Sequence, residues 1–489
     1  MSLALLLLSV LPPALCAAVF LRPPFPEMFG RQAWMPGVLC AAWTLGLVVV
    51  ALLLPDALWL TALVGTVLGA FLARGRLAAR FARQPLPPGS MSFAGGVRGL
   101  ADRSFYTAGF AKWGPIFKTT QFGAPILCVG GMERIARLLH EHAADLGPSP
   151  VAVTRSIEGN FLRYMDEETH AEYGKLFRRA MAGDAPATAL QRLRGNARLL
   201  LVELAREEYS DPRPALHRFT RESLDLLLFG FTGEDDRSRS FAELADRFYV
   251  SSIGQALTRA DRRLLEEMKS LVVEPWKRLD AGASQAECVI ARMRAIDPSM
   301  PDRVCLDNLV LMHKIATNNV SSLLLWLLYY WGTQADIVGR IRSIDDRERS
   351  AALNAFLFET LRLSQSEYLY RRVVRDFEFD GFRFPQGWMV RSCIWESHRS
   401  TEALPGPTEF RLRLEPDAYT RDHFSPFGMG RHACNGVAIN DAICRSWLAA
   451  LADDFDLRIT EAEPFTRRMR HWSHWQPNPA MKIRCSTRQ

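Results

Sequence analysis

The sequence predicts a mainly α-helical body with small β-sheets, preceded by an apolar membrane-anchoring region. Residues 1–73 carry only four charged side chains, far fewer than a soluble surface needs. Residues 186–300 and 306–331 space their apolar side chains as helices do. Short alternating stretches at 116–129 and 371–382, interrupted by Gly, Pro and Asp, are typical of paired strands.

Composition excludes several function classes. The chain has 489 residues, 48% of them hydrophobic and 23% charged, which fits a globular protein with an apolar appendage. The net charge of +7 is spread over many arginines without a basic block, so we expect no nucleic-acid partner. The nine cysteines form no Cys-x-x-Cys pair, which argues against a disulfide framework or zinc site and favours a reducing compartment.

The N-terminal region contains three apolar runs that approach the about 17–25 residues needed to cross a bilayer, at 3–21, 38–54 and 57–73. No basic segment precedes the first run, so a cleaved signal peptide is disfavoured. Arginines 74, 76, 80 and 83 follow the third run and predict a cytoplasmic location for that end. Either all three runs span the membrane, or 3–21 only anchors while 38–73 forms a spanning or dipping hairpin.

The expected domain organisation has three parts. Residues 1–83 form the membrane-anchoring region, residues 84–90 form a linker with three prolines, and residues 91–489 form the catalytic domain. Proline-rich segments are semi-rigid. The linker is therefore expected to orient the catalytic domain against the bilayer.

The most informative stretch is residues 427–436, a glycine-rich loop that contains Cys434. Its glycines permit positive φ angles and let the backbone approach a flat, bulky partner. An apolar helical run starts at 437, so the sulfur is predicted to lie at a helix N-terminus, which favours the thiolate. A thiolate in a rigid loop suits an axial iron ligand; the alternative is an ordinary buried cysteine in a turn.

This loop resembles the haem-binding signature of the cytochrome P-450 superfamily, Phe-Gly-x-Gly-x-Arg/His-x-Cys-x-Gly, and every defined position is filled. The resemblance extends over about residues 85–489. It implies the cytochrome P-450 fold, haem b (iron protoporphyrin IX) as cofactor, and Cys434 as the metal ligand. A cysteinate ligand increases electron density at a haem iron and so favours oxygen activation.

The same resemblance implies three residues that bind the haem propionates. His170 matches the histidine of a Met-Asp-x-x-x-His sequence, with Asp166 as the expected helix N-cap. The arginine usually found four positions later is Gly174 here. Arg371 opens the family's Arg-x-x-x-x-Asp-x-x-x-x-Gly pattern, and His432 lies two residues before the cysteine. An exposed histidine in a first helical turn is the alternative for His170.

Glu359 and Arg362 match the family's Glu-x-x-Arg, and their spacing allows an ion pair on one helix face. In the family, an arginine from a later segment completes this pair. That segment is shifted by one residue here, and Arg413 is the expected partner.

The apolar run 306–331 predicts a buried central helix, which the resemblance places over the iron, yet residues 316–322 are polar. Asparagine favours caps and turns over helix interiors, so Asn318 and Asn319 predict a local distortion. A kink that satisfies both amides through backbone carbonyls is the alternative. By resemblance, Asn318 occupies the position of the usual acid and Asn319 that of the usual threonine, which makes them the candidate catalytic residues.

The implied function is monooxygenation of a lipophilic small molecule with O₂. Electrons would come from a separate reductase or ferredoxin, because the chain has no flavin or nicotinamide fingerprint. The protein is expected in a membrane, with the catalytic domain on the cytoplasmic side. One alternative is a haem-thiolate isomerase or peroxide-using enzyme, since prostacyclin-synthase-like members resemble this chain in carrying Asn at that helix position. A non-catalytic haem sensor or an integral-membrane scaffold is the other.

Overall fold

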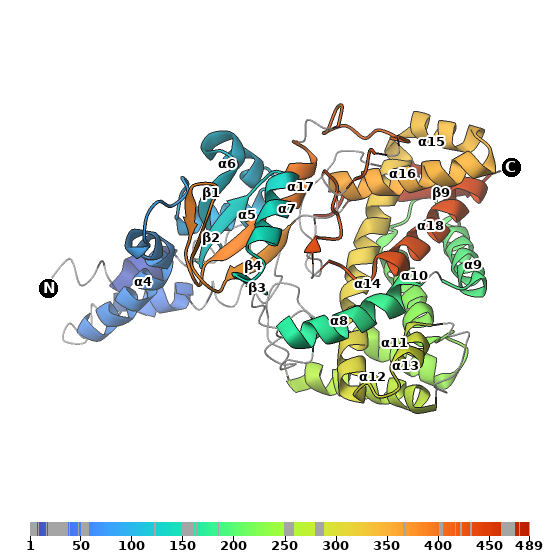
Figure 1. Cartoon of the computed structure of the whole chain (residues 1–489), viewed down its shortest axis with the longest axis horizontal. Helices are drawn as coiled ribbons and strands as arrows, with labels where there is room; N and C mark the ends of the chain where they lie inside the picture. The colour runs from blue at the N-terminus through green and yellow to red at the C-terminus, as the bar shows by residue number, and fades with distance from the viewer. Residues whose placement is uncertain are drawn as a thin grey trace. The chain divides into compact units, whose positions relative to one another are not determined.

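The computed structural model is mainly helical with small sheets, as the sequence predicts. It divides into two compact units (Figure 1). Unit 1 comprises Met1–Ser149, Glu367–Ser400 and Thr466–His471, and unit 2 comprises Pro150–Ser366, Thr401–Phe465 and Trp472–Gln489. The structure describes residues 7, 9–15, 17, 38, 40–46, 48–49, 58–121, 124–148, 161–162, 165, 167–183, 185–248, 259–278, 288–364, 368–400, 404–415, 417–420, 423–430, 433–460, 475–478 and 480–488.

Unit 1 is built on a five-stranded sheet of order β1-β2-β7-β4-β3. The hairpin predicted at 116–129 is confirmed, with Ile116 opposite Val129 in an antiparallel pair. The β2–β7 pair is parallel, and the other neighbours are antiparallel. The elements are β1 (Ile116–Gln121), β2 (Ala124–Val129), β3 (Leu146–Pro148), β4 (Leu369–Val373), β7 (Met389–Ser392), α5 (Phe93–Ala101), α6 (Phe105–Trp113), α7 (Met132–Glu141) and α17 (Ile394–His398).

Two local expectations for unit 1 have different outcomes. The predicted turn at Asp-Gly is confirmed: β5 (Phe377–Phe379) and β6 (Phe382–Phe384) form a hairpin. Asp380 and Gly381 both have positive φ, 48° and 78°, as a tight hairpin turn requires. The helical spacing of the apolar residues over 132–146 predicts one helix there, and this prediction is wrong at its end. Helix α7 stops at Glu141, and Leu146 begins β3, which pairs with β4.

Helix α4 (Leu58–Phe81) contains the third apolar run, and its segment Leu60–Phe81 is long and apolar enough to cross a bilayer. Its Thr61 hydroxyl lies 2.9 Å from that of Ser9, so described residues of the first run contact this helix. The Pro55-Asp56 break between the second and third runs lies outside the described residues. The number of spans and the boundaries at 83 and 90 stay predictions.

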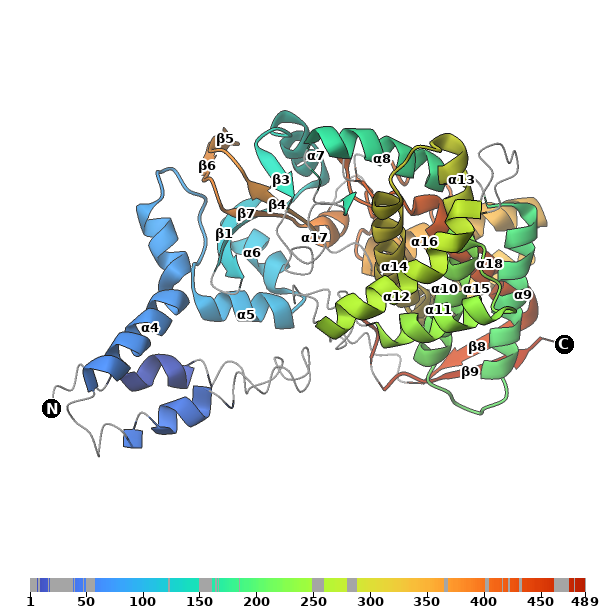
Figure 2. The same ribbon diagram turned by 90° about the horizontal axis from the view of Figure 1, so that it is seen from below.

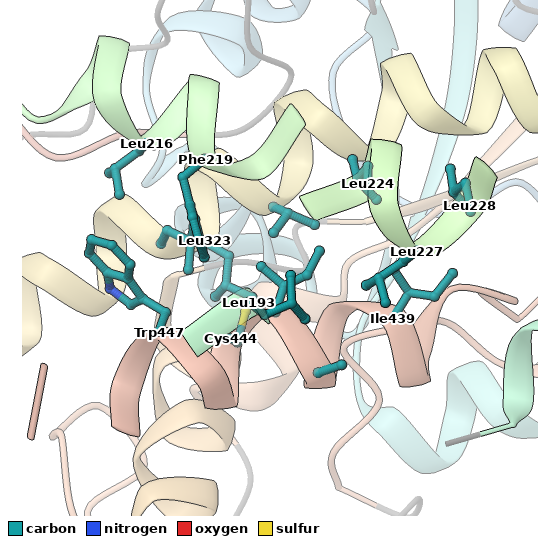
Figure 3. Packing of buried hydrophobic residues seen from close by; sticks show 14 of the residues in the cluster. Leu193, Leu216, Phe219, Leu224, Leu227, Leu228, Leu323, Ile439, Cys444 and Trp447 are labelled. Carbon is teal, nitrogen blue, oxygen red and sulfur yellow. The ribbon is translucent and has the colours of Figure 1, made fainter. Parts of the chain in front are cut away.

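Unit 2 is a helical assembly with one small sheet (Figure 2). Figure 3 shows its core, where α9, α10, α14 and α18 pack together; the Phe219 and Trp447 ring centroids are 5.4 Å apart. The elements are α8 (Glu167–Ala182), α9 (Ala187–Leu204), α10 (Arg213–Leu224), η4 (Asp225–Phe229), α11 (Asp236–Arg247), α12 (Arg259–Arg278), α13 (Val289–Ile296), α14 (Asp302–Thr333), α15 (Ala335–Ser343), α16 (Asp346–Ser364), α18 (Val437–Asp454), β8 (Phe455–Ile459) and β9 (Ile483–Thr487).

The central helix α14 is continuous over 32 residues, so the distortion predicted at Asn318 and Asn319 is wrong. Neighbouring hydroxyls bond back along the helix, from Thr317 to the His313 carbonyl at 2.8 Å and from Ser321 to the Thr317 carbonyl at 2.6 Å. Such bonds satisfy buried polar side chains without a break. The irregular turn is instead η4, a π-helix after α10 that no sequence pattern indicated.

Candidate active site

The loop that carries Cys434 folds back on itself. The Cys434 N–H donates to the Phe427 carbonyl at 2.9 Å, and Gly428 and Gly430 have φ angles of 79° and 67°. No atom lies within 4 Å of a Cβ placed on Gly430, so glycine is needed there for conformation rather than for space. Helix α18 begins at Val437. The backbone thus fixes the thiol just ahead of a helix N-terminus.

The Cys434 thiol is accessible, whereas six of the other cysteines that the structure describes are buried and Cys40 is half-buried. Burial of its surroundings nevertheless raises the pKa of the Cys434 thiol, and a hydrogen bond from the Gly436 N–H acts in the opposite direction. The Gly436 N–H thus acts in the direction predicted for a helix N-terminus, but desolvation has the larger effect on the pKa of the free thiol. An exposed cysteine with buried surroundings is what we expect at the wall of a ligand site. An iron ion that binds such a thiol removes its proton.

A second feature of unit 2 fits a large flat ligand. Most of α14 is buried, but residues near its middle are at least partly accessible, and Ile315 is 40% exposed. These residues follow the spacing of one helix side. We call them the open stripe: Met312, Ile315, Ala316, Asn318 and Asn319. An accessible thiol in a glycine-rich loop and an uncovered stripe on the central helix fit a haem with Cys434 as its iron ligand.

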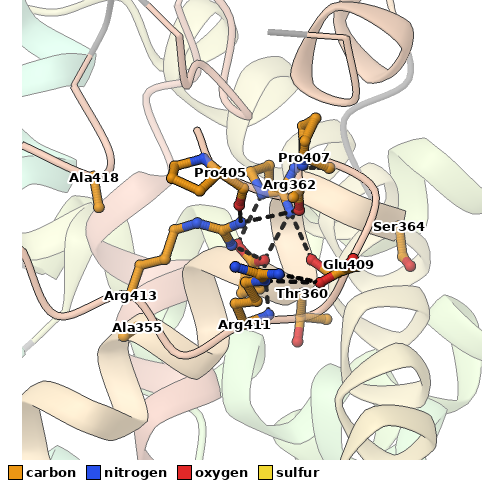
Figure 4. A network of polar contacts seen from close by, with 12 residues as sticks. Ala355, Thr360, Arg362, Ser364, Pro405, Pro407, Glu409, Arg411, Arg413 and Ala418 are labelled. Carbon is orange, nitrogen blue, oxygen red and sulfur yellow. Dashed lines mark hydrogen bonds and ion pairs between the residues drawn. The ribbon is translucent and has the colours of Figure 1, made fainter. Parts of the chain in front are cut away.

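The predicted ion pair on α16 is the centre of a buried network (Figure 4). Arg362 donates twice to Glu359, at 2.8 and 2.7 Å, and neither side chain is exposed. Arg413 forms a second ion pair with Glu359, which confirms it as the expected partner. Backbone carbonyls between 405 and 409 accept from both arginines. The network therefore ties α16 to the segment at 405–413.

His170 lies on α8 and is buried, so the alternative of an exposed histidine is wrong. A Cβ on Gly174 would lie 3.3 Å from the His170 ring. A larger side chain at this position would therefore require the ring to shift by a few tenths of an ångström. Helix α8 begins at Glu167, and the predicted N-cap Asp166 lies outside the described residues.

Of the other two predicted propionate ligands, Arg371 lies within the described residues. Arg371 lies on β4 of unit 1, where it pairs with Val390 and donates to the Tyr370 carbonyl at 2.9 Å. His432 lies outside the described residues. The contacts of His170, Arg371 and His432 with a haem stay predictions, as do the catalytic roles of Asn318 and Asn319.

Comparison with known proteins identifies the family. The cytochrome P450 family model matches residues 334–483, which include the Glu359 network and the Cys434 loop. The chain belongs to the cytochrome P450 superfamily. Abscisic acid 8'-hydroxylase 2 of Arabidopsis thaliana is 24% identical over 397 residues, 72% of this chain and 80% of that protein. Putative cytochrome P450 139 of Mycobacterium bovis is 29% identical over 204 residues, 38% of this chain and 47% of that protein.

The fold of this cytochrome P450 also matches a solved structure. Retinoic acid bound cyanobacterial CYP120A1 superimposes with a TM-score of 0.69 and 20% identity, covering 83% of this chain and 100% of that one. The protein is thus an enzyme of the cytochrome P450 monooxygenase type, with iron protoporphyrin IX as cofactor.

Proposed function

We propose that this cytochrome P450 hydroxylates a lipophilic small molecule with O₂ and electrons from a separate reductase or ferredoxin. The observation that carries the proposal is the accessible Cys434 thiol in its glycine-rich loop. Similarity to an abscisic acid 8'-hydroxylase over 72% of the chain supports hydroxylation as the reaction. The apolar members of the open stripe, Met312, Ile315 and Ala316, support an apolar substrate.

The site residues have three roles in this proposal. Bound haem supplies the oxygen chemistry. Cys434 holds the iron, and His170, Arg371 and His432 neutralise the propionates. Asn318 and Asn319 orient water or substrate, since an amide donates and accepts hydrogen bonds but does not titrate in the useful range. The protons must then come from water or substrate, because neither residue can release one.

We also propose that the enzyme works at a membrane, with its catalytic domain on the cytoplasmic side. Helix α4 presents apolar side chains to its surroundings; Leu60, Leu63 and Val67 are each at least half exposed. The arginines that end this apolar segment support a cytoplasmic location for the body of the chain.

Replacement of the cysteine tests the proposal. Cys434→Ser should abolish the thiolate-type spectrum of the reduced CO complex, because a hydroxyl does not supply a thiolate ligand. Cys444→Ser is the matched control, since Cys444 is a buried cysteine on α18. It should keep the spectrum. Survival of the thiolate spectrum in Cys434→Ser would show that another residue binds the iron.

A further inference from the structure

The arginines of the chain are widely distributed, but its excess of positive charge is not. Residues 57–132 contain eight basic side chains and one acidic side chain, so their net charge of +7 equals that of the whole chain. These residues form α4 and the first helices and strands of unit 1. The rest of the chain is electrically balanced. A partner that recognises net positive charge should therefore bind next to the apolar helix.

Two of these arginines lie on one side of α4 near its end. Arg76 and Arg80 are four residues apart and both are exposed. Neither forms an ion pair with a carboxylate among the residues that the structure describes, whereas Arg83 interacts electrostatically with Asp376. Like charges four residues apart destabilise a helix. Only Arg80 lies in the last turn, where the helix dipole favours a cation, so the pair needs a negative charge from elsewhere.

The position of this pair along α4 matches the headgroup layer of a bilayer. Residues 58–73 of the helix are uncharged and about 24 Å long, which is most of the about 30 Å hydrocarbon core. Arg74 follows, and Arg76 and Arg80 lie about 3 and 9 Å beyond it along the helix axis. Lipid headgroups occupy about 5–8 Å on each side of the core. The pair therefore lies at the depth where lipid phosphate and carboxylate groups are found.

The linker fixes the end of α4 to the body of unit 1. The Arg383 N–H of β6 donates to the Pro85 carbonyl at 2.7 Å. The Lys118 N–H of β1 donates to the Pro88 carbonyl at 2.8 Å. The linker is thus bonded to two sheets a few residues after Arg80. A headgroup that holds the arginine pair therefore also holds the body close to the bilayer.

We propose that Arg76 and Arg80 bind the headgroup of an anionic phospholipid on the cytoplasmic side of the membrane. The inference rests on the proposed membrane location, and it adds a selection among lipids that an apolar helix alone does not make. A zwitterionic headgroup carries no net charge and leaves the pair unbalanced, whereas an anionic headgroup balances it. One arginine at a membrane surface corresponds to a preference for anionic lipid of about fivefold.

Spin-labelled lipids measure this selection on the full chain. The protein is reconstituted in phosphatidylcholine vesicles that contain a trace of phosphatidylserine or phosphatidylcholine labelled on an acyl chain. Electron spin resonance resolves the lipid that is slowed at the protein surface, and the ratio of slowed to free label gives the relative association constants of the two lipids. In wild type, phosphatidylserine should associate about fivefold more strongly. The preference should fall in about 1 M salt, which screens exposed charges.

Three double variants assign that preference. Arg76→Gln with Arg80→Gln should remove most of it, and Arg76→Lys with Arg80→Lys should keep it, because the headgroup responds to charge. The control, Arg458→Gln with Arg484→Gln, removes the same charge from an exposed pair on β8 and β9 and should behave as wild type. The thiolate-type CO spectrum shows that each variant is folded.

The outcomes separate this inference from the membrane location on which it rests. Equal association of the two lipids with wild type overturns the inference. A preference that survives in the Gln variant, or an equal loss in the control, does the same. Absence of slowed lipid from all of the proteins instead overturns the membrane location itself.

Discussion

Glu359 illustrates how a single buried residue joins α16 to the segment at 405–413. Its carboxylate accepts from Arg362, Arg413, the Arg411 backbone N–H and the Tyr419 hydroxyl. Two cations and one anion are thus enclosed at the same place. Removing charge from one member of a buried pair is strongly destabilising, because the partner charge is left without compensation.

We expect Glu359→Gln to destabilise the protein by about 3–5 kcal/mol and to lower its haem content. The amide keeps the shape but leaves Arg362 and Arg413 uncompensated. Arg411→Ala is the control, since its side chain is 49% exposed and exposed ion pairs contribute about 0–1 kcal/mol. Denaturant unfolding of both variants measures the difference. Equal stability of Glu359→Gln and wild type would contradict a structural role for the pair.

Lys314 is a second buried charge, on the side of α14 that packs against α11. It is 5% exposed and donates to the Ala245 carbonyl at 2.9 Å. Desolvation by burial lowers its pKa to about 8, despite the attraction of Asp246. The folded protein therefore holds this proton less tightly than the unfolded chain does. The charged lysine therefore lowers the free energy of unfolding. This loss of stability is fully present below about pH 8 and disappears as pH rises towards 10.5.

We expect Lys314→Met to raise the free energy of unfolding at pH 7 by up to about 3 kcal/mol, which is the free-energy equivalent of the pKa shift. Loss of the hydrogen bond to the Ala245 carbonyl reduces this gain. The difference between variant and wild type should shrink between pH 8 and 10.5. Unfolding followed by tryptophan fluorescence measures both quantities, with the exposed Lys277→Met on α12 as control. A variant that is less stable than wild type at pH 7 would show that the hydrogen bond dominates.

At the scale of elements, α14 combines a regular backbone with an unusual polar centre. The helix runs without interruption past Asn318 and Asn319, so these residues change side-chain chemistry rather than backbone geometry. General acid–base assistance is typically worth ~10²–10⁴-fold. An enzyme that replaces an acid and an alcohol by two amides must obtain protons elsewhere or avoid the need for them.

Restoring the usual pair tests what the asparagines do. For a monooxygenase, Asn318→Asp with Asn319→Thr should keep or improve the coupling of NADPH consumption to product, and turnover should require a reductase. An isomerase or peroxide-using enzyme should instead work without a reductase and lose activity in Asn319→Ala. Tightly coupled, reductase-dependent turnover that neither asparagine affects would show that they do not tune the oxygen chemistry.

The elements also show why some features were predictable. The Cys434 loop, the Glu359–Arg362 pair and the Asp380-Gly381 turn depend on a few adjacent residues, so local sequence specifies them. The end of α7 was missed because Leu146 pairs with Val373, a residue far away in the sequence, and helical spacing does not show such a contact. The distortion was misplaced because hydroxyls bond back along α14 and leave its backbone intact.

At the scale of the whole molecule, the N-terminal helix region has a different surface from the rest of the chain. Helix α4 has accessible apolar side chains along its length, although it also contacts β2 and α5 of unit 1. One such contact joins Phe71 to Phe93 of α5, with ring centroids 6.3 Å apart. Membrane attachment should therefore depend on the anchoring region, with only a small effect on the fold of the body.

Two truncations separate the contributions of this region. Removal of residues 1–83 should release the protein from membranes and retain the thiolate-type CO spectrum, since α4 ends at Phe81 and the proline-rich linker comes next. Removal of residues 1–57 keeps α4, which contains a 22-residue segment able to span a bilayer. This shorter truncation should stay in the membrane fraction after a carbonate wash.

The pattern of outcomes locates the anchor. Release of both truncated proteins would show that α4 does not hold the membrane and that the earlier apolar runs do. Retention of both would place membrane-binding surface beyond residue 83, in the body itself. Helix α4 is supported as a sufficient anchor only if the protein without residues 1–57 stays in the membrane and the protein without residues 1–83 is released. Loss of the CO spectrum on removal of 1–83 would show that the anchoring region also supports the fold.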